Sequence, residues 1–403
     1  MLAWNLSVAI WIAHNGGKFS MHPRLARLGR HYAAFSLMVF VLSVLALRLD
    51  FRPPGDAVGH LLRTPELLFI ARLTQFGLAA TSMIVLANVL SQDSGLIRFL
   101  AASYMWVGVA NAAYATVSWC VLAFAGVDLS GAYWPDLVSE GLPRARAFFN
   151  EGGPYGLYAV SVVLVVMFRR YALRDIGRGV TAVAIAVVGT SIVLSISKAA
   201  FVCLVAIWFW LGVRKIHMRQ IILTGCFATV VIVATPIRQQ LEDYYQSYSN
   251  LEIVAALQPD NGNLVVGRIA ALYIVPRIVA DHPLVGVGFG NYSLVRNNAK
   301  YLGMIPESRY WDLPGLGLAG YAAELGIPLL VYLLWIIWSP VRIGLRTRAS
   351  GAVVALGAFQ FFAQMCGAQI TFFYPWLVAA LALGLLLQVP GEGARAREPR
   401  LQS

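Results

Sequence analysis

Basic side chains at four separate places in the sequence have the chemistry to hold a phosphate group. Lys198 stands between two strongly apolar runs, and Arg268 lies in a long polar stretch. Arg144 and Arg146 precede a further apolar run, and Arg72 lies inside another. A guanidinium donates two hydrogen bonds to one phosphate, and a charge within an apolar run is expensive without a function. We therefore expect these cations to bind a polyanionic headgroup such as a pyrophosphate; the alternative is that they contact lipid headgroups.

Carboxylates and aromatic rings accompany these cations in the polar segments. Three acids are candidates for a general base, which requires a pKa raised by burial: Asp312, Glu307 and Glu151. Tyr292 and Trp311 add aromatic rings to the same long stretch, and Arg296 adds another cation. A long segment of this composition is typical of a ligand-binding loop, and the cations predict an anionic ligand.

Neither a metal nor a nucleotide cofactor is indicated. The four cysteines, Cys120, Cys203, Cys226 and Cys366, all lie in apolar runs without metal-ligand spacing. The glycine-rich run at 283–291, Pro-Leu-Val-Gly-Val-Gly-Phe-Gly-Asn, superficially resembles a dinucleotide loop but has no strand–helix context. We interpret it as a tight structural turn rather than a ligand-binding loop.

The elements that must position these residues are apolar helices. Of the 403 residues, 59% are hydrophobic and 12% are charged, against about 25% charged in a soluble domain. A spanning helix needs roughly 20 mostly apolar residues. The sequence therefore predicts an all-α polytopic membrane protein with about eleven spans, at 2–14, 31–48, 66–90, 99–126, 154–168, 177–195, 199–213, 220–235, 316–338, 350–370 and 374–389.

The distribution of charge predicts which side each loop occupies. The net charge is +12, but the basic residues form short clusters between spans rather than a patch for nucleic acid. These clusters are Lys18, Arg24, Arg27 and Arg30; Arg169, Arg170, Arg174 and Arg178; Arg214, Lys215 and Arg219; and Arg342, Arg346 and Arg348, joined by Arg395, Arg397 and Arg400 of the tail. Counting helices places all of them on one side, which we expect to be cytoplasmic. Segments 49–65, 127–153, 195–199, 236–315 and 371–373 then face the periplasm.

This topology divides the chain into helices over 1–235, a long periplasmic loop over 236–315, helices over 316–390 and a disordered cytoplasmic tail over 391–403. From Val266 to Val285 the long loop alternates apolar and basic residues at helical spacing, which predicts short amphipathic helices on the membrane surface. The topology also places the N-terminus outside, so we expect a possible twelfth helix upstream.

Five motifs occur in an order that resembles the O-antigen ligase and O-antigen polymerase superfamily. They are Arg146-x-Phe-Phe-Asn-Glu, Ser197-Lys-Ala-Ala, Gly267-Arg, Pro283-Leu-Val-Gly-Val-Gly-Phe-Gly-Asn-Tyr, and Tyr321-Ala-Ala-Glu-Leu-Gly-Ile-Pro. The resemblance covers roughly residues 66–390. It implies a GT-C-like helical fold in the bacterial inner membrane, with a periplasmic site that needs no metal or cofactor. The substrate implied is a glycan on undecaprenyl pyrophosphate, which is joined to an acceptor hydroxyl.

The resemblance also implies roles for particular residues. Arg268 looks like the arginine that grips the pyrophosphate, and Lys198 stands where many members have a second arginine. Gly315 occupies the position at which ligases carry a histidine, and this favours an O-antigen or exopolysaccharide polymerase. The alternatives are a ligase that transfers the glycan to lipid A-core and, in another class, a transporter of lipid-linked sugars or small anions, although no Gly/Pro-broken helix is evident. A flippase, a chain-length regulator and membrane lipids are the expected partners.

Overall fold

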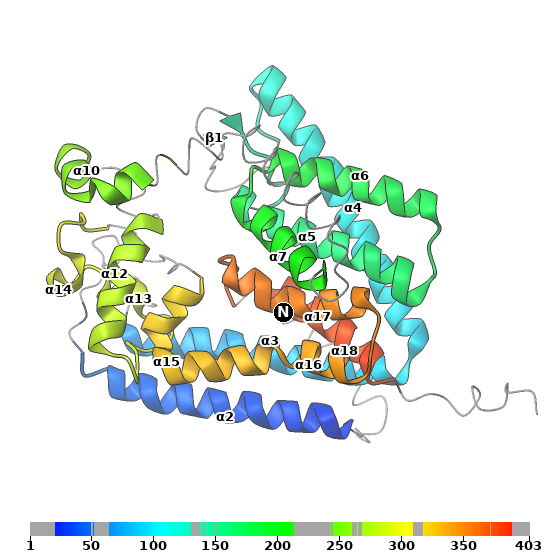
Figure 1. Ribbon diagram of the computed structural model, residues 1–403, viewed down its shortest axis with the longest axis horizontal. Coiled ribbons are helices and arrows are strands. Elements are labelled where there is room, and N and C mark those ends of the chain that lie inside the picture. The colour runs from blue at the N-terminus through cyan, green and yellow to red at the C-terminus, as the bar shows by residue number, and fades with distance from the viewer. Residues whose placement is uncertain are drawn as a thin grey trace, which may run out of the picture.

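The protein is a bundle of apolar helices with a group of shorter helices at one end, as a computed structural model shows (Figure 1). The described residues are 21–49, 51, 64–129, 138–139, 142–149, 151–212, 242, 245–259, 264, 268–308, 317–370 and 372–388. The first half contains α2 (Pro23–Ala46), α3 (Pro65–Gln92), α4 (Ser94–Ala125), the paired strands β1 (Val138–Ser139) and β2 (Leu142–Pro143), α5 (Gly152–Phe168), the π-helix η3 (Arg169–Leu173), α6 (Arg178–Leu194) and α7 (Lys198–Gly212). The second half contains α10 (Leu251–Leu257), α12 (Arg268–Asp281), α13 (Tyr292–Val295), α14 (Ala299–Leu302), α15 (Leu318–Ile337), α16 (Ser339–Arg346), α17 (Gly351–Met365) and α18 (Phe373–Leu386).

The helices have the length and surface of membrane-embedded segments. Within the described ranges, five are long and apolar enough to cross a membrane, namely α2, α3, α4, α5 with η3, and α15, and four shorter apolar helices accompany them, namely α6, α7, α17 and α18. Large apolar side chains point outward, including Leu37 (65% exposed), Phe99 (65%) and Phe124 (85%). Lipid, rather than water, suits such a surface. The prediction of an all-α membrane protein is confirmed at this level, whereas the predicted spans at 2–14 and 220–235 lie outside the described residues.

Capping residues explain where two predicted boundaries were wrong. The structure starts α2 at Pro23 rather than 31, because His22 caps the helix by accepting a hydrogen bond from the Arg24 N–H. It starts α4 at 94 rather than 99, because Asp93 accepts from the N–H groups of Gly95 and Leu96 at 2.7 and 3.1 Å. Both starts are polar, so a hydropathy criterion misses them.

Close packing in the bundle depends on small residues. A Cβ atom on Gly108 of α4 would lie 2.4 Å from Val162 of α5, and one on Gly384 of α18 would lie 2.5 Å from Leu90 of α3. Membrane helices approach one another closely where small residues remove the side-chain barrier. These contacts hold α3, α4, α5 and α18 together in the core.

Successive helices run in opposite directions, so the bundle has two chemically different ends. We call one end the loop end; α2, α4, α6 and α17 finish there, and α3, α5, α7, α15 and α18 begin there. Figure 1 shows α10, α12, α13 and α14 gathered beyond α2, α3 and α15 at the loop end. We call the opposite end the arginine end; it carries the start of α2, η3 and α16, where three of the predicted basic clusters lie. This is the common side that the charge pattern predicted, and its cytoplasmic location stays a prediction.

The short helices of the long loop form a second apolar core. Ile269, Ile274 and Ile278 of α12 are buried with Val295 of α13 and with Ala323 of α15. Short helices were predicted in this region, and α12 is packed against a bundle helix rather than lying only on a surface. Helix α12 therefore packs against the first half of α15.

The helix α15 is broken, which the sequence analysis did not find. Gly326 has φ 72° and ψ 169°, and Pro328 follows inside the helix. The backbone of the long loop fills the break, because the Ile327 N–H donates to the Pro283 carbonyl at 2.8 Å. A Cβ atom on Gly326 would lie 2.6 Å from Leu284, so only glycine allows the loop so close.

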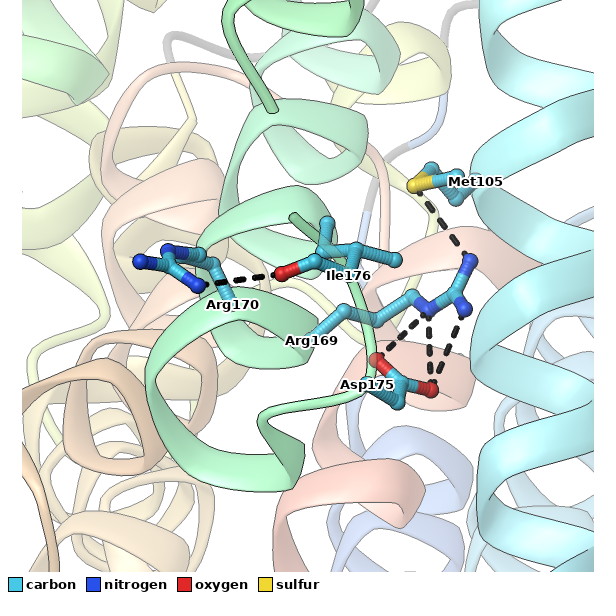
Figure 2. A network of polar contacts seen from close by, with 5 residues as sticks. All are labelled: Met105, Arg169, Arg170, Asp175 and Ile176. Carbon is cyan, nitrogen blue, oxygen red and sulfur yellow. Dashed lines mark hydrogen bonds and ion pairs between the residues drawn. The ribbon is translucent and has the colours of Figure 1, made fainter. Parts of the chain in front are cut away.

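A buried ion pair organises the arginine end, as Figure 2 shows. The Arg169 guanidinium, in a side chain 9% exposed, bonds both carboxylate oxygens of Asp175 at 3.1–3.3 Å and also approaches the Met105 sulfur. Arg170 donates to the Ile176 carbonyl at 3.1 Å. Arg174, with φ 55°, ends η3. Two of the four arginines of this cluster therefore fold the chain rather than only carrying charge.

Candidate functional site

The glycine-rich run is the turn that the sequence predicted, and it docks onto α15. Gly286, Gly288 and Gly290 have φ values of 67°, 93° and 84°. The Val287 N–H donates to the Ala323 carbonyl at 2.9 Å, and the Gly288 N–H donates to the Glu324 carbonyl at 3.0 Å. A Cβ atom on Gly286 would lie 2.4 Å from that Glu324 oxygen. Glycine is required here both for conformation and for space.

Docking of this turn brings Arg72, Tyr292 and Glu324 together from α3, α13 and α15. The Tyr292 N–H donates to the Glu324 carboxylate at 3.4 Å, a long contact. A Cβ atom on Gly290 would lie 2.6 Å from the Arg72 Cγ atom, so the turn lies directly against the arginine. Tyr321 lies near both Arg72 and Glu324. We define the loop-end cluster as Arg72, Asn291, Tyr292, Arg296 and Glu324.

Arg296 is the most unusual member of the loop-end cluster. Its side chain follows Tyr292 by one helical turn and is 1% exposed. Both terminal nitrogens, Nη1 and Nη2, lack a hydrogen-bond partner in the described part of the chain, as does Oδ1 of the neighbouring Asn291. Removing one partner from a buried ion pair commonly costs about 3–5 kcal/mol. Arg296 interacts with the Tyr292 side chain, but its two buried terminal nitrogens leave hydrogen-bonding capacity that an anion would complete.

Burial changes the pKa values of two members of the loop-end cluster. Burial lowers the pKa of the Arg296 guanidinium, while the adjacent Tyr292 phenol raises it. Burial raises the pKa of Tyr292 to about 12, against the lowering effect of Arg296. The Tyr292 hydroxyl is therefore protonated at neutral pH and is available as a hydrogen-bond donor.

A second group of predicted residues meets where α5 and α7 begin. The Arg144 Nε donates to the Ser195 carbonyl at 3.2 Å, and the Ser197 hydroxyl donates to the Gly153 carbonyl at 3.2 Å. Ile196, with φ 49°, makes the tight turn that precedes Lys198. The turn predicted over 195–199 is confirmed, and it places Arg144 near the half-buried Lys198 at the loop end.

Arg146 has an acidic partner that the sequence analysis did not identify. Its guanidinium pairs with the Asp128 carboxylate at 2.6 Å, and its side chain is 3% exposed. This ion pair ties the segment before α5 to the residues after α4. Arg146 is thus engaged in the fold, whereas the sequence hypothesis gave it a phosphate contact.

The remaining predicted residues are less defined by the structure. Arg268 begins α12, but its side chain lies outside the described part of the protein, and Asp312 and Trp311 lie outside it altogether. Glu307 and Glu151 are exposed rather than buried as the base hypothesis requires. Among the described residues, no group of three or more His, Cys, Asp or Glu side chains is arranged to hold a metal ion.

Glu324, Tyr321 and Asn291 were missed as site residues. The sequence contained a signal for Glu324 and Tyr321, because both lie in the Tyr-Ala-Ala-Glu motif noted only as part of a resemblance. Gly326 and Pro328 of the same motif were a signal for the break in α15 that the sequence analysis did not use. The cluster combines cations for a phosphate with a carboxylate that can accept a proton.

No family model and no curated protein matches this chain. The functional assignment therefore depends on the geometry of the site and on the chemistry of its residues.

Proposed function

We propose that this protein is a membrane glycan polymerase that transfers an oligosaccharide from a polyprenyl pyrophosphate to the hydroxyl of an acceptor sugar. The observation that carries the proposal is the loop-end cluster. There the glycine turn lies against the half-buried Arg72, and the short helix that follows it brings Tyr292 to Glu324 and carries the buried Arg296 with its unpaired terminal nitrogens. An undecaprenyl carrier suits a site at the end of apolar helices, because its lipid stays in the membrane while its pyrophosphate reaches the polar residues.

The cations bind the glycan donor, a polyprenyl-pyrophosphate-linked oligosaccharide. Arg72 and Arg296 bind the pyrophosphate and stabilise the negative charge that grows as the glycosidic C–O bond breaks. Stabilisation of developing charge is commonly the largest catalytic contribution. Lys198, Arg144 and Arg268 begin or precede helices at the same end, and we assign them to the same polyanion. Tyr292, protonated at neutral pH, donates a hydrogen bond to a phosphate oxygen.

Glu324 acts as the general base for the acceptor hydroxyl. The acceptor oxygen attacks the anomeric carbon, its proton passes to the Glu324 carboxylate, and polyprenyl pyrophosphate leaves with the bonding electrons. This role replaces Asp312, Glu307 and Glu151 as first choice, because the Glu324 carboxylate lies beside Tyr292 and beside Tyr321, which Arg72 also approaches. The absence of a histidine at Gly315 favours a polymerase over a ligase.

Transport is the competing function of another class, and the break in α15 bears on it. Transporters often bind substrate at a broken helix. Here the break at Gly326 is closed by the backbone of Pro283 and Leu284, so a substrate does not have free access to it. This favours a site at the loop end over a pathway along α15.

The proposal is tested by deleting the gene, complementing with variants and profiling glycans by size. Arg72→Ala and Glu324→Gln should reduce polymer by roughly 10²–10³-fold, the usual effect of losing a transition-state contact or a base. Arg48→Ala, which removes an exposed cation at the same end, is the matched control and should retain full-length polymer.

The glycan pattern of the deletion strain separates the alternatives. Surface glycans one repeat long indicate a lost polymerase, and polymer stranded on the lipid carrier indicates a lost ligase. Unchanged glycans would refute both.

A further inference from the structure

A cavity at the arginine end is distinct from the loop-end cluster and has no role in the proposed function. It has a volume of about 500 Å³ and lies between η3, the connection from α16 to α17, and the end of α18. Ligand pockets span about 300–1,000 Å³. Its lining combines a polar part, made of Arg174, Thr347 and Ser350, with an apolar part that includes Val353, Leu385 and Leu386.

The polar part of the cavity lining has an available positive charge. Arg169 is neutralised by Asp175, and Arg170 is bonded to the Ile176 carbonyl, as Figure 2 shows. Arg174 is exposed and lines the cavity. The Thr347 hydroxyl already donates to the Ile343 carbonyl at 3.0 Å. In the part of the chain that the structure describes, no carboxylate lines the cavity to oppose an anion.

The apolar part of the cavity lining comes from the ends of α17 and α18. Leu385 and Leu386 end α18, and Val353 lies in the first turn of α17. Tyr171, 56% exposed, also lines the cavity and has the amphipathic side chain typical of the membrane–water boundary. A ligand that fits both parts of the lining has an anionic head and a hydrocarbon tail.

We propose that this cavity binds an anionic phospholipid, with the phosphate on Arg174 and the acyl chain along Leu385 and Leu386. Basic pockets between membrane helices on the cytoplasmic side recognise anionic headgroups in this way. Such a lipid would contact η3, α17 and α18 at once, where these three elements surround the cavity. The site is independent of the glycan chemistry at the opposite end.

The test uses the purified full-length protein in neutral detergent, with phosphatidylglycerol and phosphatidylcholine as probes. Native mass spectrometry counts retained lipid, and the thermal unfolding midpoint is measured as each lipid is titrated. Arg174→Gln should weaken phosphatidylglycerol binding about 10- to 100-fold, as expected for loss of a charge-assisted contact. Arg174→Gly removes the same charge, and glycine adopts the φ of 55° of this position without strain. Loss of lipid binding in this variant therefore cannot be attributed to backbone strain. Arg178→Gln is the matched control, because it removes an equal charge from an exposed position outside the cavity lining.

The proposal requires retention of phosphatidylglycerol by the wild type and by Arg178→Gln, and its loss from both Arg174 variants. Equal binding of phosphatidylcholine, or equal loss in Arg178→Gln, would overturn it. Competition with inorganic phosphate distinguishes a lipid headgroup from a free phosphate ion as the ligand of the cavity. If inorganic phosphate displaces phosphatidylglycerol completely at the phosphate concentration that saturates Arg174, the cavity is a small-anion site and the lipid proposal is wrong.

Discussion

Two buried arginines should respond to the same substitution with opposite changes in stability. Arg296 is 1% exposed with both terminal nitrogens unpaired among the described residues, whereas Arg169 is paired with Asp175. Methionine has a similar length and no charge. The comparison separates an arginine retained for binding from one retained for folding.

The magnitudes follow from what each substitution leaves behind. Arg296→Met removes a desolvated charge and its contact with the Tyr292 side chain, but among the described residues it breaks no ion pair. Replacing buried ionic groups with apolar ones is neutral or stabilising by about 1–4 kcal/mol. Arg169→Met leaves the Asp175 carboxylate, 13% exposed, without its bidentate partner. Breaking such a pair costs about 3–5 kcal/mol, and we expect the lower value because Asp175 keeps some contact with solvent.

The assay combines unfolding with function. Purified variants are compared by thermal and denaturant unfolding in one detergent, and the same variants are scored in cells for polymer length. Arg296→Met should be at least as stable as the wild type and yet make no polymer, while Arg169→Met should be less stable. If Arg296→Met is destabilised as much as Arg169→Met, Arg296 is structural. If it is stable and makes normal polymer, Arg296 is not part of the site.

Two further predictions concern the elements that position the site. Gly286→Ala places a Cβ atom 2.4 Å from the Glu324 carbonyl at a φ of 67°, so it should displace the turn and abolish polymer. The control Gly367→Ala, at a φ of 93° in open space, should cost only roughly 1–2 kcal/mol of left-handed strain and should retain polymer length. Equal polymer in both variants would contradict docking of the turn on α15. Asp128→Asn should reduce the free energy of unfolding by roughly 1–3 kcal/mol, because the buried Arg146 guanidinium loses its ion pair with this carboxylate. Adding Arg146→Met should restore most of that loss. A double variant no more stable than Asp128→Asn would refute the ion-pair interpretation.

The fold was predictable where local patterns determine it. The starts and ends of α5, α6 and α7 agree with the predicted spans to within two residues, because each is an apolar run bounded by polar or glycine residues. The Ser-Lys turn before α7 and the glycine turn at 286–290 were also predicted from residue type. The break at Gly326 was not, because it depends on the backbone of Pro283 entering α15, a contact between distant segments.

The residue types of the loop-end cluster could be selected from the sequence, but their grouping could not. Arg72, Arg296 and Tyr292 were selected by charge and aromatic character. The structure places Tyr292 beside Arg296 and the glycine turn before them against Arg72. Asp128 could not be selected, because its partnership with Arg146 arises from packing between α4 and α5. Glu324 was visible only as part of a motif, since its position beside the arginines requires the docked turn.

The most direct test of the central claim is a reaction with purified components. The protein is reconstituted in vesicles with an oligosaccharide on undecaprenyl pyrophosphate, and both glycan length and free undecaprenyl pyrophosphate are measured over time. The account predicts a ladder of lengthening glycans, with one undecaprenyl pyrophosphate released for each bond formed, and its loss in Arg72→Ala and Glu324→Gln. Transfer of intact lipid-linked oligosaccharide across the membrane without a ladder, or an unchanged ladder in both variants, would contradict it.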